Sequence, residues 1–466
     1  MTGTATLGLI PLPVHVHASG AGTWLFDGTL SNELDPSLGH PERYVLSVGD
    51  DGVRIRGSTG EALFRGATTL QQLADACAGQ LPHLEIDDSP RFSWRGLSLD
   101  VVRTFFTVDQ VKRIIDQLAR FKCNVLHLHL SDHEGWRLEI RSWPDLTAIG
   151  GRGARKDRPG GWYSQDDYRE LVRYAAERFV TIVPEIDMPG HCTAALAAYP
   201  ELRGRVEPGE FAGVPHAVLD PDLAATPRFV RDVIGELAEL TPGSWLHIGG
   251  DEAFGITDDA YRRFVTFARQ VVADAGKRCI GWQETARASL SSDQLVQYWI
   301  HLPDLPTDAP PAIVRLFDAA EGDLAAATGA GARVIASPLA FAYLDQPYTE
   351  PGPDEQEERR RRLGPRAYPG TSLRSAVDWD PLALAPTLTH DAQLAGVEAA
   401  MWCETVTDFD DLQFLLQPRL AGVAERAWSQ QDTFDWPDYR TRLAHQAPRW
   451  RSEGWNFFRG ASVDWR

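Results

Sequence analysis

The stretch Trp245-Leu-His-Ile-Gly-Gly-Asp251-Glu252 joins a short apolar run to two glycines and two adjacent carboxylates. A short apolar run that ends in glycine is typical of a buried strand. Paired glycines let the backbone leave strand geometry, so both acids can face one cleft. Two acids at the end of a strand suit proton transfer combined with charge stabilisation. The alternative is structural, because Asp-Glu is also favoured at the N-cap and first turn of a helix.

Other apolar runs of strand length lie on both sides of this stretch and alternate with amphipathic segments. The predicted strands cover residues 97–100, 124–132, 180–187, 245–251, 277–282, 295–299, 333–337 and 396–402. The predicted helices cover residues 108–122, 167–179, 227–240, 258–275 and 412–428. Eight strands that alternate with helices predict a (β/α)8 barrel, the TIM-barrel fold.

A small α+β domain is expected to precede the barrel, in residues 1–90, with the barrel and a C-terminal helical segment in 91–466. Alternating runs at 44–49 and 52–57, joined by Asp50-Asp51-Gly52, predict a hairpin. Residues 67–76 have helical spacing and a Thr that could cap the helix. The turn-rich segment Asp87-Asp-Ser-Pro-Arg-Phe predicts the domain boundary.

Composition excludes several classes of function. The net charge of -19 over 466 residues argues against a nucleic-acid or anionic membrane partner. No apolar run is long enough to span a membrane. The opening Met1-Thr-Gly-Thr-Ala lacks the basic and apolar regions of a secretory signal, so we expect a cytoplasmic protein. Scattered cysteines without a C-x-x-C pair argue against a disulfide framework or a zinc ribbon; they are Cys77, Cys123, Cys192, Cys279 and Cys403.

The carboxyl ends of the predicted strands carry the side chains that could take part in catalysis or ligand binding. In barrels of this kind the active site lies at those ends. They hold Asp100, Arg103, Asp132, Asp187, His191, Asp251, Glu252, Trp282, Trp299, Tyr343, Asp345, Trp402 and Glu404. Acids with one Arg and four aromatic rings favour a sugar cleft, since a pyranose packs its C–H face on an aromatic ring. No P-loop and no glycine-rich dinucleotide motif follows a strand.

Eight motifs in order carry a family resemblance. They are Arg95-Gly-Leu-Ser-Leu-Asp100-Val-Val-Arg103, His127-Leu-His-Leu-Ser-Asp132, Pro184-Glu-Ile-Asp187-Met-Pro-Gly-His191, His247-Ile-Gly-Gly-Asp251-Glu252, Gly281-Trp282-Gln-Glu, Gln297-Tyr-Trp299, Tyr343-Leu-Asp345 and Trp402-Cys-Glu404. This series resembles the family 20 glycoside hydrolases, the β-N-acetylhexosaminidases. The resemblance runs from about residue 40 to the C-terminus, and the preceding domain is similar to the family's usual companion domain.

The resemblance implies an exo-acting, retaining enzyme that removes terminal β-linked GlcNAc or GalNAc. In this family the substrate's own 2-acetamido oxygen attacks the anomeric carbon and forms an oxazoline. Glu252 would be the general acid and base, with Asp132 and His191 as the relay behind it. Asp251 would bind the acetamido N–H and stabilise the developing positive charge, and Tyr343 would orient the acetamido oxygen.

The remaining positions would hold the sugar. By the same resemblance Trp282, Trp299 and Trp402 would wall the acetamido pocket, and Arg103, Asp345 and Glu404 would bind the outer hydroxyls of a terminal sugar. No metal or cofactor is implied, and the expected partner is an oligosaccharide or glycoside with a terminal N-acetylhexosamine. The oligomeric state stays open. Each position also has a structural alternative, since the Trp rings could be core, Arg103 an ion pair, and His191 a helix cap.

The sequence departs from the family pattern in two places. His133-Glu134 follow Asp132, where the family commonly has Asp and then Gln, which puts the pH optimum in doubt. Ala367 and Tyr368 stand where a Trp is expected on the aglycone side. The nearby charge run at 354–362 predicts a solvated loop or short helix. Its four arginines could instead form a rim for an anionic aglycone or a sulfated sugar.

Three rival functions stay open. A family 20 enzyme could be specialised for a sulfated or disaccharide terminal unit. The barrel could bind sugar without catalysis, although intact Asp251, Glu252 and Tyr343 speak against that. His127-x-His129 on one strand face also resembles the metal pair of amidohydrolases. That class needs further His and a carboxylate on later strands, for which few residues are available.

Overall fold

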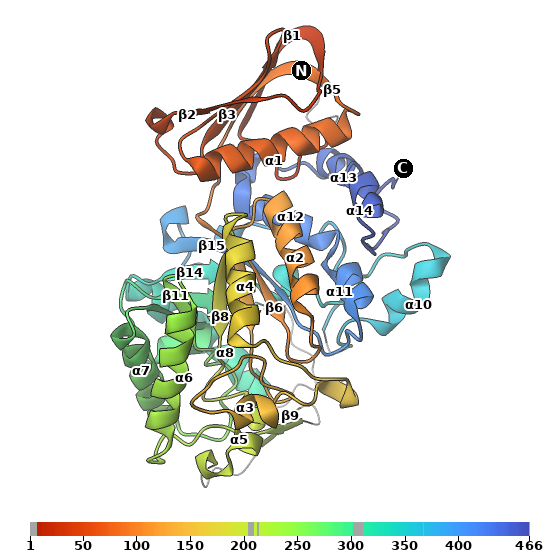
Figure 1. The fold of residues 1–466 in the computed structure, drawn as a ribbon. Coiled ribbons are helices and arrows are strands. Elements are labelled where there is room, and N and C mark those ends of the chain that lie inside the picture. Colours follow the sequence, from red (N-terminus) through yellow and green to blue (C-terminus); the bar gives the residue numbers. More distant parts are fainter. Residues whose placement is uncertain (1–6, 204–208, 212–213, 302–310, 367, 466) are drawn as a thin grey trace.

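A five-stranded sheet crossed by one helix lies above a closed barrel of parallel strands (Figure 1). The computed structural model describes residues 7–203, 209–211, 214–301, 311–366 and 368–465. The opening residues 1–5, on which the expectation about a secretory signal rests, and Ala367 lie outside the described residues. Among the residues described, no helix combines the length and the apolar character that a membrane span requires.

The N-terminal sheet has the strand order β1-β5-β3-β4-β2. Its strands are β1 (His15–Leu25), β2 (Ser31–Leu34), β3 (Tyr44–Gly49), β4 (Gly52–Gly57) and β5 (Gln80–Asp88). The predicted hairpin is confirmed, since β3 pairs antiparallel with β4 and Gly49 faces Gly52 across the turn. One face of the sheet packs on α1 (Gly60–Ala76) and the other is open to solvent (Figure 1).

Helix α1 begins seven residues before the predicted start at residue 67. The Thr59 side chain caps it by accepting the Ala62 N–H at 3.2 Å. Two glycines in the early turns, Gly60 and Gly66, hide the helical signal because glycine is a poor helix former. Gly66 serves packing instead, since a Cβ there would lie 2.6 Å from Cγ2 of Ile55 in the sheet.

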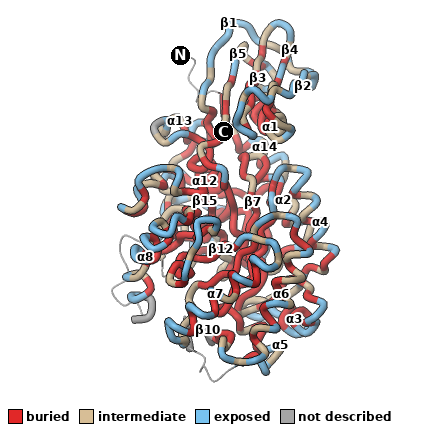
Figure 2. The backbone as a smooth tube through the Cα atoms, turned by 90° about the vertical axis from the view of Figure 1, so that its left-hand side faces the viewer, coloured by how far each residue is buried: buried red, intermediate tan, exposed pale blue. Residues whose placement is uncertain are grey.

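The predicted (β/α)8 fold is confirmed. Eight parallel strands close in the order β11-β12-β13-β14-β15-β6-β7-β8. They are β6 (Trp94–Asp100), β7 (Val125–His129), β8 (Thr181–Glu185), β11 (Trp245–His247), β12 (Arg278–Trp282), β13 (Leu295–Tyr298), β14 (Arg333–Ala336) and β15 (Leu394–Met401). Helices cover these strands, so the strands are buried almost throughout (Figure 2).

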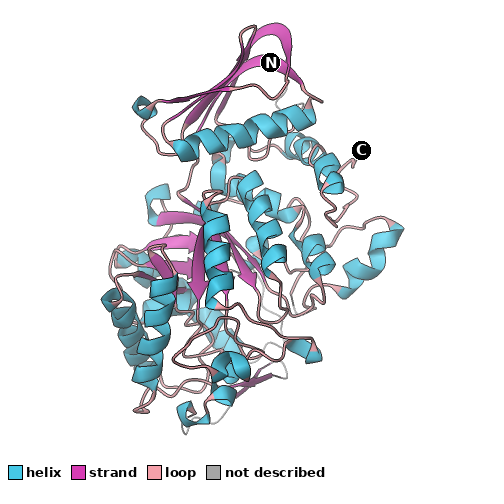
Figure 3. Ribbon diagram, viewed as in Figure 1, coloured by secondary structure: helices cyan, strands magenta, loops and turns pink. Residues whose placement is uncertain are grey.

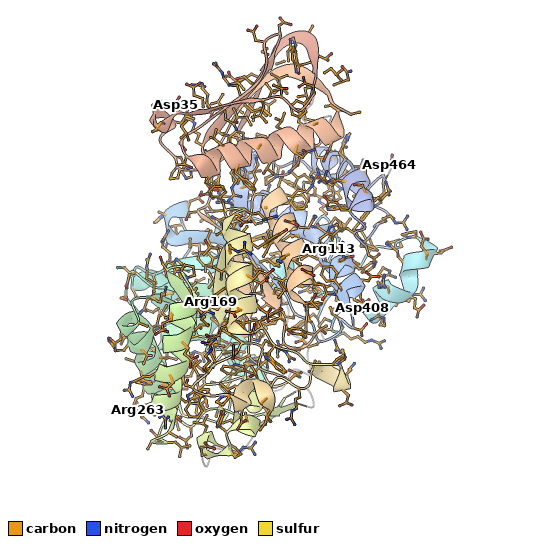
Figure 4. The ribbon with its side chains drawn as sticks, viewed as in Figure 1. Asp35, Arg113, Arg169, Arg263, Asp408 and Asp464 are labelled. Atoms are coloured by element: carbon orange, nitrogen blue, oxygen red, sulfur yellow. The ribbon has the colours of Figure 1, made fainter. Side chains whose placement is uncertain are left out.

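Helices form the outer layer of the barrel (Figure 3). The longer ones are α2 (Val108–Arg120), α4 (Gln165–Ala176), α6 (Thr226–Leu240), α7 (Asp258–Asp274), α8 (Pro311–Gly329) and α12 (Arg419–Trp428). A capping box of Thr107 and Gln110 begins α2. The solvent face of this layer carries charged side chains, for example Arg169 on α4 and Arg263 on α7 (Figure 4).

Two predictions about helices were wrong or incomplete. The segment 412–428 forms two helices, α11 (Phe409–Leu416) and α12, because Pro418 cannot continue a helix. Helix α8 was not predicted. The shorter elements are α3 (Asp145–Ala148), α5 (Thr193–Ala198), α9 (Leu339–Ala342), α10 (Asp354–Arg362), α13 (Trp436–Ala444), α14 (Ala447–Ser452), and the hairpin β9 (Gly209–Phe211) with β10 (Val214–His216).

The N-terminal sheet covers the end of the barrel at which the strands begin. Asp88, the last residue of β5, binds Lys122 Nζ at 2.8 Å, just before β7. The Trp428 indole on α12 also donates to Asp88, at 3.0 Å. The predicted boundary near residue 90 falls between β5 and β6. The carboxyl ends of the strands therefore open at the opposite end of the barrel.

Candidate active site

A cavity of about 90 Å³ lies at the carboxyl ends of the barrel strands. Its walls are Arg103, His129, Asp132, Asp187, His191, Asp251, Glu252, Trp299, Tyr343, Asp345, Pro365, Tyr368, Trp402 and Glu404. Every site residue predicted from the sequence is among them except Trp282. Residues from seven strands or the loops that follow them thus converge on one cavity.

The backbone around the two adjacent acids departs sharply from strand geometry. Strand β11 ends at His247, four residues earlier than predicted, and Gly249 and Gly250 have φ values of 67° and 99°. The Gly250 N–H donates to Asp187 Oδ1 at 3.0 Å, and this carboxylate lies against Gly249. Glycine is needed there because a Cβ would lie 1.8 Å from Asp187 Oδ1.

Asp251 and Glu252 do not form the first turn of a helix. The next helix, α7, begins at Asp258, and the Thr257 side chain caps it by accepting the Ala260 N–H at 3.2 Å. The two acids instead lie in the loop and face the cavity. The structural alternative for this pair is therefore wrong.

A chain of side chains leads from Asp132 to Glu252. His191 Nδ1 lies 3.0 Å from Asp132 Oδ1. The other ring nitrogen, Nε2, lies 3.5 Å from Glu252 Oε2 and 3.6 Å from Asp251 Oδ2. His191 does not cap α5, the helix that follows it, because α5 has Cys192 at its N-cap and no side-chain capping bond. The structure thus brings the predicted relay residues together.

The charges of the relay follow from its surroundings. Burial opposes charge on Asp132, but Arg103 and His191 hold the pKa of that carboxyl well below its usual range. Burial likewise opposes charge on His191, yet Asp132 and Asp251 raise the pKa of the imidazole well above its usual value. Burial raises the pKa of Asp251 to about 6, although His191 acts in the opposite direction. Anionic Asp132 therefore supports a cationic His191 beside the two acids.

Arg103 links several acids at the cavity wall. Its Nη2 atom lies 2.7 Å from Asp132 Oδ2 and 3.9 Å from Glu404 Oε1. Its Nη1 atom lies 3.3 Å from Asp100 Oδ2, and the guanidinium stands over the Trp402 ring at 5.3 Å. Arg103 is thus both part of an ion-pair network and a residue of the cavity.

Three aromatic rings form one wall of the cavity. The rings of Trp299 and Tyr343 stack with centroids 6.3 Å apart, and those of Tyr343 and Trp402 lie 6.1 Å apart. Trp282 lies one layer deeper than predicted. It is fully buried, its ring lies 5.9 Å from Trp402, and its indole N–H donates to Glu185 Oε1 at 2.8 Å. Trp282 therefore supports the wall from below.

Carboxylate oxygens in the cavity lack partners. Within the described parts of the chain, Asp251 Oδ1, Asp345 Oδ1 and Glu404 Oε2 are buried and accept no hydrogen bond. Burial, reinforced by Glu404, raises the pKa of Asp345 well above its usual value. Burial also raises the pKa of Glu404, against the effect of Arg103. Buried polar atoms normally have partners, so this cavity suits a ligand with several hydroxyl or amide groups.

The residues after Asp132 contact the relay from the side. The His133 ring stacks on His191 with centroids 4.8 Å apart, and its Nδ1 atom lies 2.8 Å from Thr193 Oγ1. Its backbone N–H donates to Asp132 Oδ1 at 2.5 Å. Glu134 pairs with Arg155 at 2.6 Å. That His133 alters the pH optimum stays a hypothesis, and its position beside His191 is compatible with it.

Sequence reasoning gave His129, Asp187, Pro365 and Tyr368 no role in the proposed reaction, although they line the cavity. Asp187 had a signal, since it stands at the end of a predicted strand. Burial and the neighbouring Asp251 raise the pKa of Asp187 well above its usual value. Tyr368 occupies the cavity wall at the position where the sequence departs from the family's Trp. Pro365 gave no local signal, because only the course of the loop brings it there.

The amidohydrolase alternative requires His127 and His129 as metal ligands. Among the described residues, four groups of histidines and acids near the cavity lie close enough to share an ion. His129, however, holds Asp132 Oδ2 at 2.7 Å through Nε2 and Glu185 Oε2 at 2.5 Å through Nδ1. Burial opposes charge on His129, yet Glu185 and Asp132 raise the pKa of the ring well above its usual value. A protonated ring with both nitrogens donating offers no lone pair to a metal.

Family models match most of the chain. The model described as glycosyl hydrolase family 20, catalytic domain, matches residues 92–257 and 254–431. The model described as glycosyl hydrolase family 20, domain 2, matches residues 21–89. Together they cover both the barrel and the N-terminal sheet.

Individual proteins agree with the family models. The chain is 40% identical to a β-N-acetylhexosaminidase of Cellulomonas fimi over 430 residues, which are 91% of this chain and 82% of that protein. It is 38% identical to the structure of a family 20 β-N-acetylhexosaminidase from Streptomyces coelicolor A3(2), with a TM-score of 0.86 and full coverage of both chains. A mutant Streptomyces plicatus β-hexosaminidase in complex with the product GlcNAc is 37% identical, with a TM-score of 0.85 over 100% of this chain and 99% of that one. The chain therefore belongs to glycosyl hydrolase family 20 and is a glycoside hydrolase.

Proposed function

We propose that this protein is an exo-acting, retaining β-N-acetylhexosaminidase that removes terminal β-linked GlcNAc or GalNAc by substrate-assisted catalysis. One observation carries the proposal. Glu252 and Asp251 face a small cavity, with His191 Nε2 3.5 and 3.6 Å from their carboxylates and Asp132 behind the imidazole. The names of its relatives from Cellulomonas and Streptomyces support the substrate class.

Glu252 acts first as an acid and then as a base. It protonates the glycosidic oxygen while the bond from that oxygen to C1 breaks, and the leaving group departs as an alcohol. The substrate's acetamido oxygen attacks C1 from the opposite face and closes an oxazolinium ring. Water then attacks C1, Glu252 takes its proton, and the ring opens. Two inversions return the β configuration. His191, supported by Asp132, holds Glu252 in place.

Asp251 and Tyr343 act on the acetamido group. The Asp251 carboxylate accepts the acetamido N–H and stabilises the positive charge that develops there. Tyr343 donates its hydroxyl to the acetamido oxygen and keeps it below C1. The Trp299 and Trp402 rings, with Tyr343 between them, restrict the group to this bent conformation. An intramolecular nucleophile held this way has an effective molarity on the order of 10⁵ M or more.

The outer part of the cavity binds the rest of the sugar. The unpartnered oxygens of Asp345 and Glu404 accept sugar hydroxyls, and Arg103 donates to them. Acids and an arginine that can bind the hydroxyls of a terminal sugar support exo action; they are Asp345, Glu404 and Arg103.

Specialisation for a sulfated sugar has less support. The charge run forms α10, and its arginines are engaged elsewhere. Arg359 and Arg362 pair with Asp411 at 3.0 and 2.6 Å, and Arg360 pairs with Glu357 at 2.8 Å. Only Arg361 of the four is largely exposed, at 75% of its side chain. These pairs fit the predicted short helix better than a rim for anions.

The stereochemical course of hydrolysis tests the mechanism. Proton NMR of a fresh reaction with an aryl β-GlcNAc should give the β-anomer of the free sugar first. An aryl β-glucoside, which has no acetamido group, should be almost inert. A thiazoline that mimics the cyclised intermediate should inhibit far more strongly than GlcNAc binds. An initial α-anomer, or efficient cleavage of the glucoside, would contradict substrate assistance.

Glu252→Gln separates the acid from the rest of the site. This variant should lose turnover of substrates with poor leaving groups and largely keep the glycosylation step with activated aryl leaving groups, which need little protonation. Wild-type rates on both substrate types would show that Glu252 is not the acid. No turnover of any GlcNAc or GalNAc glycoside by the wild type would remove the proposed function, and the non-catalytic sugar-binding alternative would take its place.

A further inference from the structure

The interior of the barrel below the cavity is polar, whereas barrel interiors are usually filled by branched apolar side chains. Five ionisable residues there are at most 1% exposed: His127, His129, Glu185, His247 and Glu398. Four of them come from the neighbouring strands β7, β8 and β11, where Glu185 pairs with His129 and with His247, and Glu398 lies on β15. Burial of this much charge is costly unless each group has a partner.

Glu185 and His129 extend the relay inward from Asp132. Glu185 Oε2 lies 2.5 Å from His129 Nδ1, and His129 Nε2 lies 2.7 Å from Asp132 Oδ2. From Asp132 the contacts continue through His191 to Glu252, at 3.0 and 3.5 Å. Glu185, His129, Asp132, His191 and Glu252 therefore alternate acid and imidazole, from the barrel interior to the general acid.

Contacts from three sides fix Glu185. Its Oε1 atom accepts the Trp282 indole N–H at 2.8 Å. Its Oε2 atom lies 3.1 Å from His127 Nε2, and His127 Nδ1 lies 2.9 Å from Glu398 Oε1. Burial opposes charge on Glu185, but the three surrounding histidines hold its pKa well below the usual range. Glu185 is therefore a buried anion held in one geometry.

We propose that His129 and Glu185 are positioning residues that set the proton affinity of Glu252 through Asp132 and His191. This inference rests on the proposed function, because it concerns the acid of that reaction. Glu185 does not line the cavity. Against the effect of burial, Glu185 and Asp132 together raise the pKa of His129, and the protonated ring donates to Asp132 and orients its other oxygen toward His191. The pair is neutral overall, so removing either member leaves one uncompensated charge behind the relay.

The two members have opposite charges, so their removal has opposite effects. Glu185→Gln leaves Asp132 as the remaining carboxylate partner of the His129 cation, so the net charge behind the relay becomes more positive, which favours the anionic form of Glu252. His129→Gln leaves the Glu185 anion uncompensated, which favours the protonated form. At the effective dielectric of buried sites, a unit charge at the distance of this pair should shift the titration of Glu252 by about half to one pH unit.

Other charged groups face the pair and stay in place in both variants. They are Asp132, Arg103, His191, Asp187, Asp251, His127, His247 and Glu398. Of these, His247 has its Nδ1 atom 3.0 Å from both the Gly249 nitrogen and Glu185 Oε1, and burial lowers the pKa of the ring. The variants therefore change the charge of the pair against a constant background.

The test is the pH dependence of kcat/KM for an aryl β-GlcNAc with a poor leaving group, whose cleavage needs the protonated acid. The basic limb of this pH profile, where activity falls as pH rises, should move to lower pH in Glu185→Gln and to higher pH in His129→Gln. The double variant should return close to the wild-type limb. With a dinitrophenyl leaving group, which needs little protonation, these shifts should disappear. Limbs that stay in place, or that move in the same direction in both single variants, would overturn the proposal.

Glu425→Gln is the matched control. Glu425 is another buried acid, but it pairs with Arg442 at 2.7 Å and binds the Leu12 N–H, far from the cavity. This variant should lose stability on heating without moving the limb. If Glu185→Gln does not fold, the pH profile of His129→Gln is the test. A basic limb in that variant at the same pH as in the wild type would overturn the proposal. A wild type without any hexosaminidase activity would instead overturn the proposed function itself.

Discussion

At the scale of single residues, the acids of the cavity differ in charge because their surroundings differ. Asp132 accepts bonds from two histidines and Arg103 and stays ionised. Asp251 has no such set of donors, and burial raises its pKa to about 6. Carboxyl groups whose pKa values are pushed apart can serve as ionised and protonated partners at one pH.

The role of Asp251 can be tested by its charge. Asp251→Asn should lower kcat by about two to three orders of magnitude, since it removes a positioned charge partner of the transition state. In the wild type, kcat/KM should fall as pH drops through about 6, because protonation removes the same charge. The variant should lack this acidic limb. A variant impaired only in KM would mean that Asp251 binds substrate and transition state equally.

At the scale of elements, the loop after β11 depends on two glycines. A Cβ on Gly249 would meet the Asp187 carboxylate, and φ is 67° there. Gly249→Ala should therefore displace Asp251 and Glu252. A misplacement of about 1 Å can cost about 100-fold in rate, and we expect a loss of kcat/KM on that scale.

Gly276→Ala is a control for backbone strain. Gly276 has a similar φ of 74°, but a Cβ there would meet no atom within 4 Å. This variant should lose some stability and keep its activity. Equal activity of the two variants would show that the contact with Asp187 does not position the acids.

At the scale of the whole molecule, a buried cluster joins the N-terminal sheet to the barrel. Lys122 Nζ binds Asp88 Oδ2 and Tyr44 Oη, both at 2.8 Å, and lies 4.5 Å from the centre of the Trp428 ring. Burial lowers the pKa of Lys122, although Asp88 acts in the opposite direction. The cluster lies at the amino ends of the strands, away from the cavity.

Lys122→Met should destabilise the protein by about 3–5 kcal/mol, because it leaves Asp88 buried without its charge partner. Thermal unfolding followed by circular dichroism measures this. The double variant Lys122→Met/Asp88→Asn should recover part of the loss, and Arg361→Ala, at an exposed side chain, should change little. A single variant as stable as the wild type would mean that the cluster contributes nothing to docking.

Much of this molecule could be predicted from local patterns. The eight barrel strands have short apolar runs, and each helix cap such as Thr107 or Thr257 lies beside the helix it begins. Strand ends in a parallel barrel meet at one rim, so acids and aromatic rings after those strands had to converge. The order of the motifs pointed to the family. These signals are all contained within a few residues of sequence.

Contacts between distant segments decided the features that local patterns could not predict. Gly66 is in α1 because it packs on Ile55, and the arginines of α10 pair with Asp411 and Glu357. The packing of strands places Trp282 beneath Trp402, and pairing of β7 with β8 places Glu185 against His129. A sequence states which residues follow a strand, but not which layer of the barrel each side chain reaches. That depends on register and on the space that partners leave, which exist only once the barrel has closed.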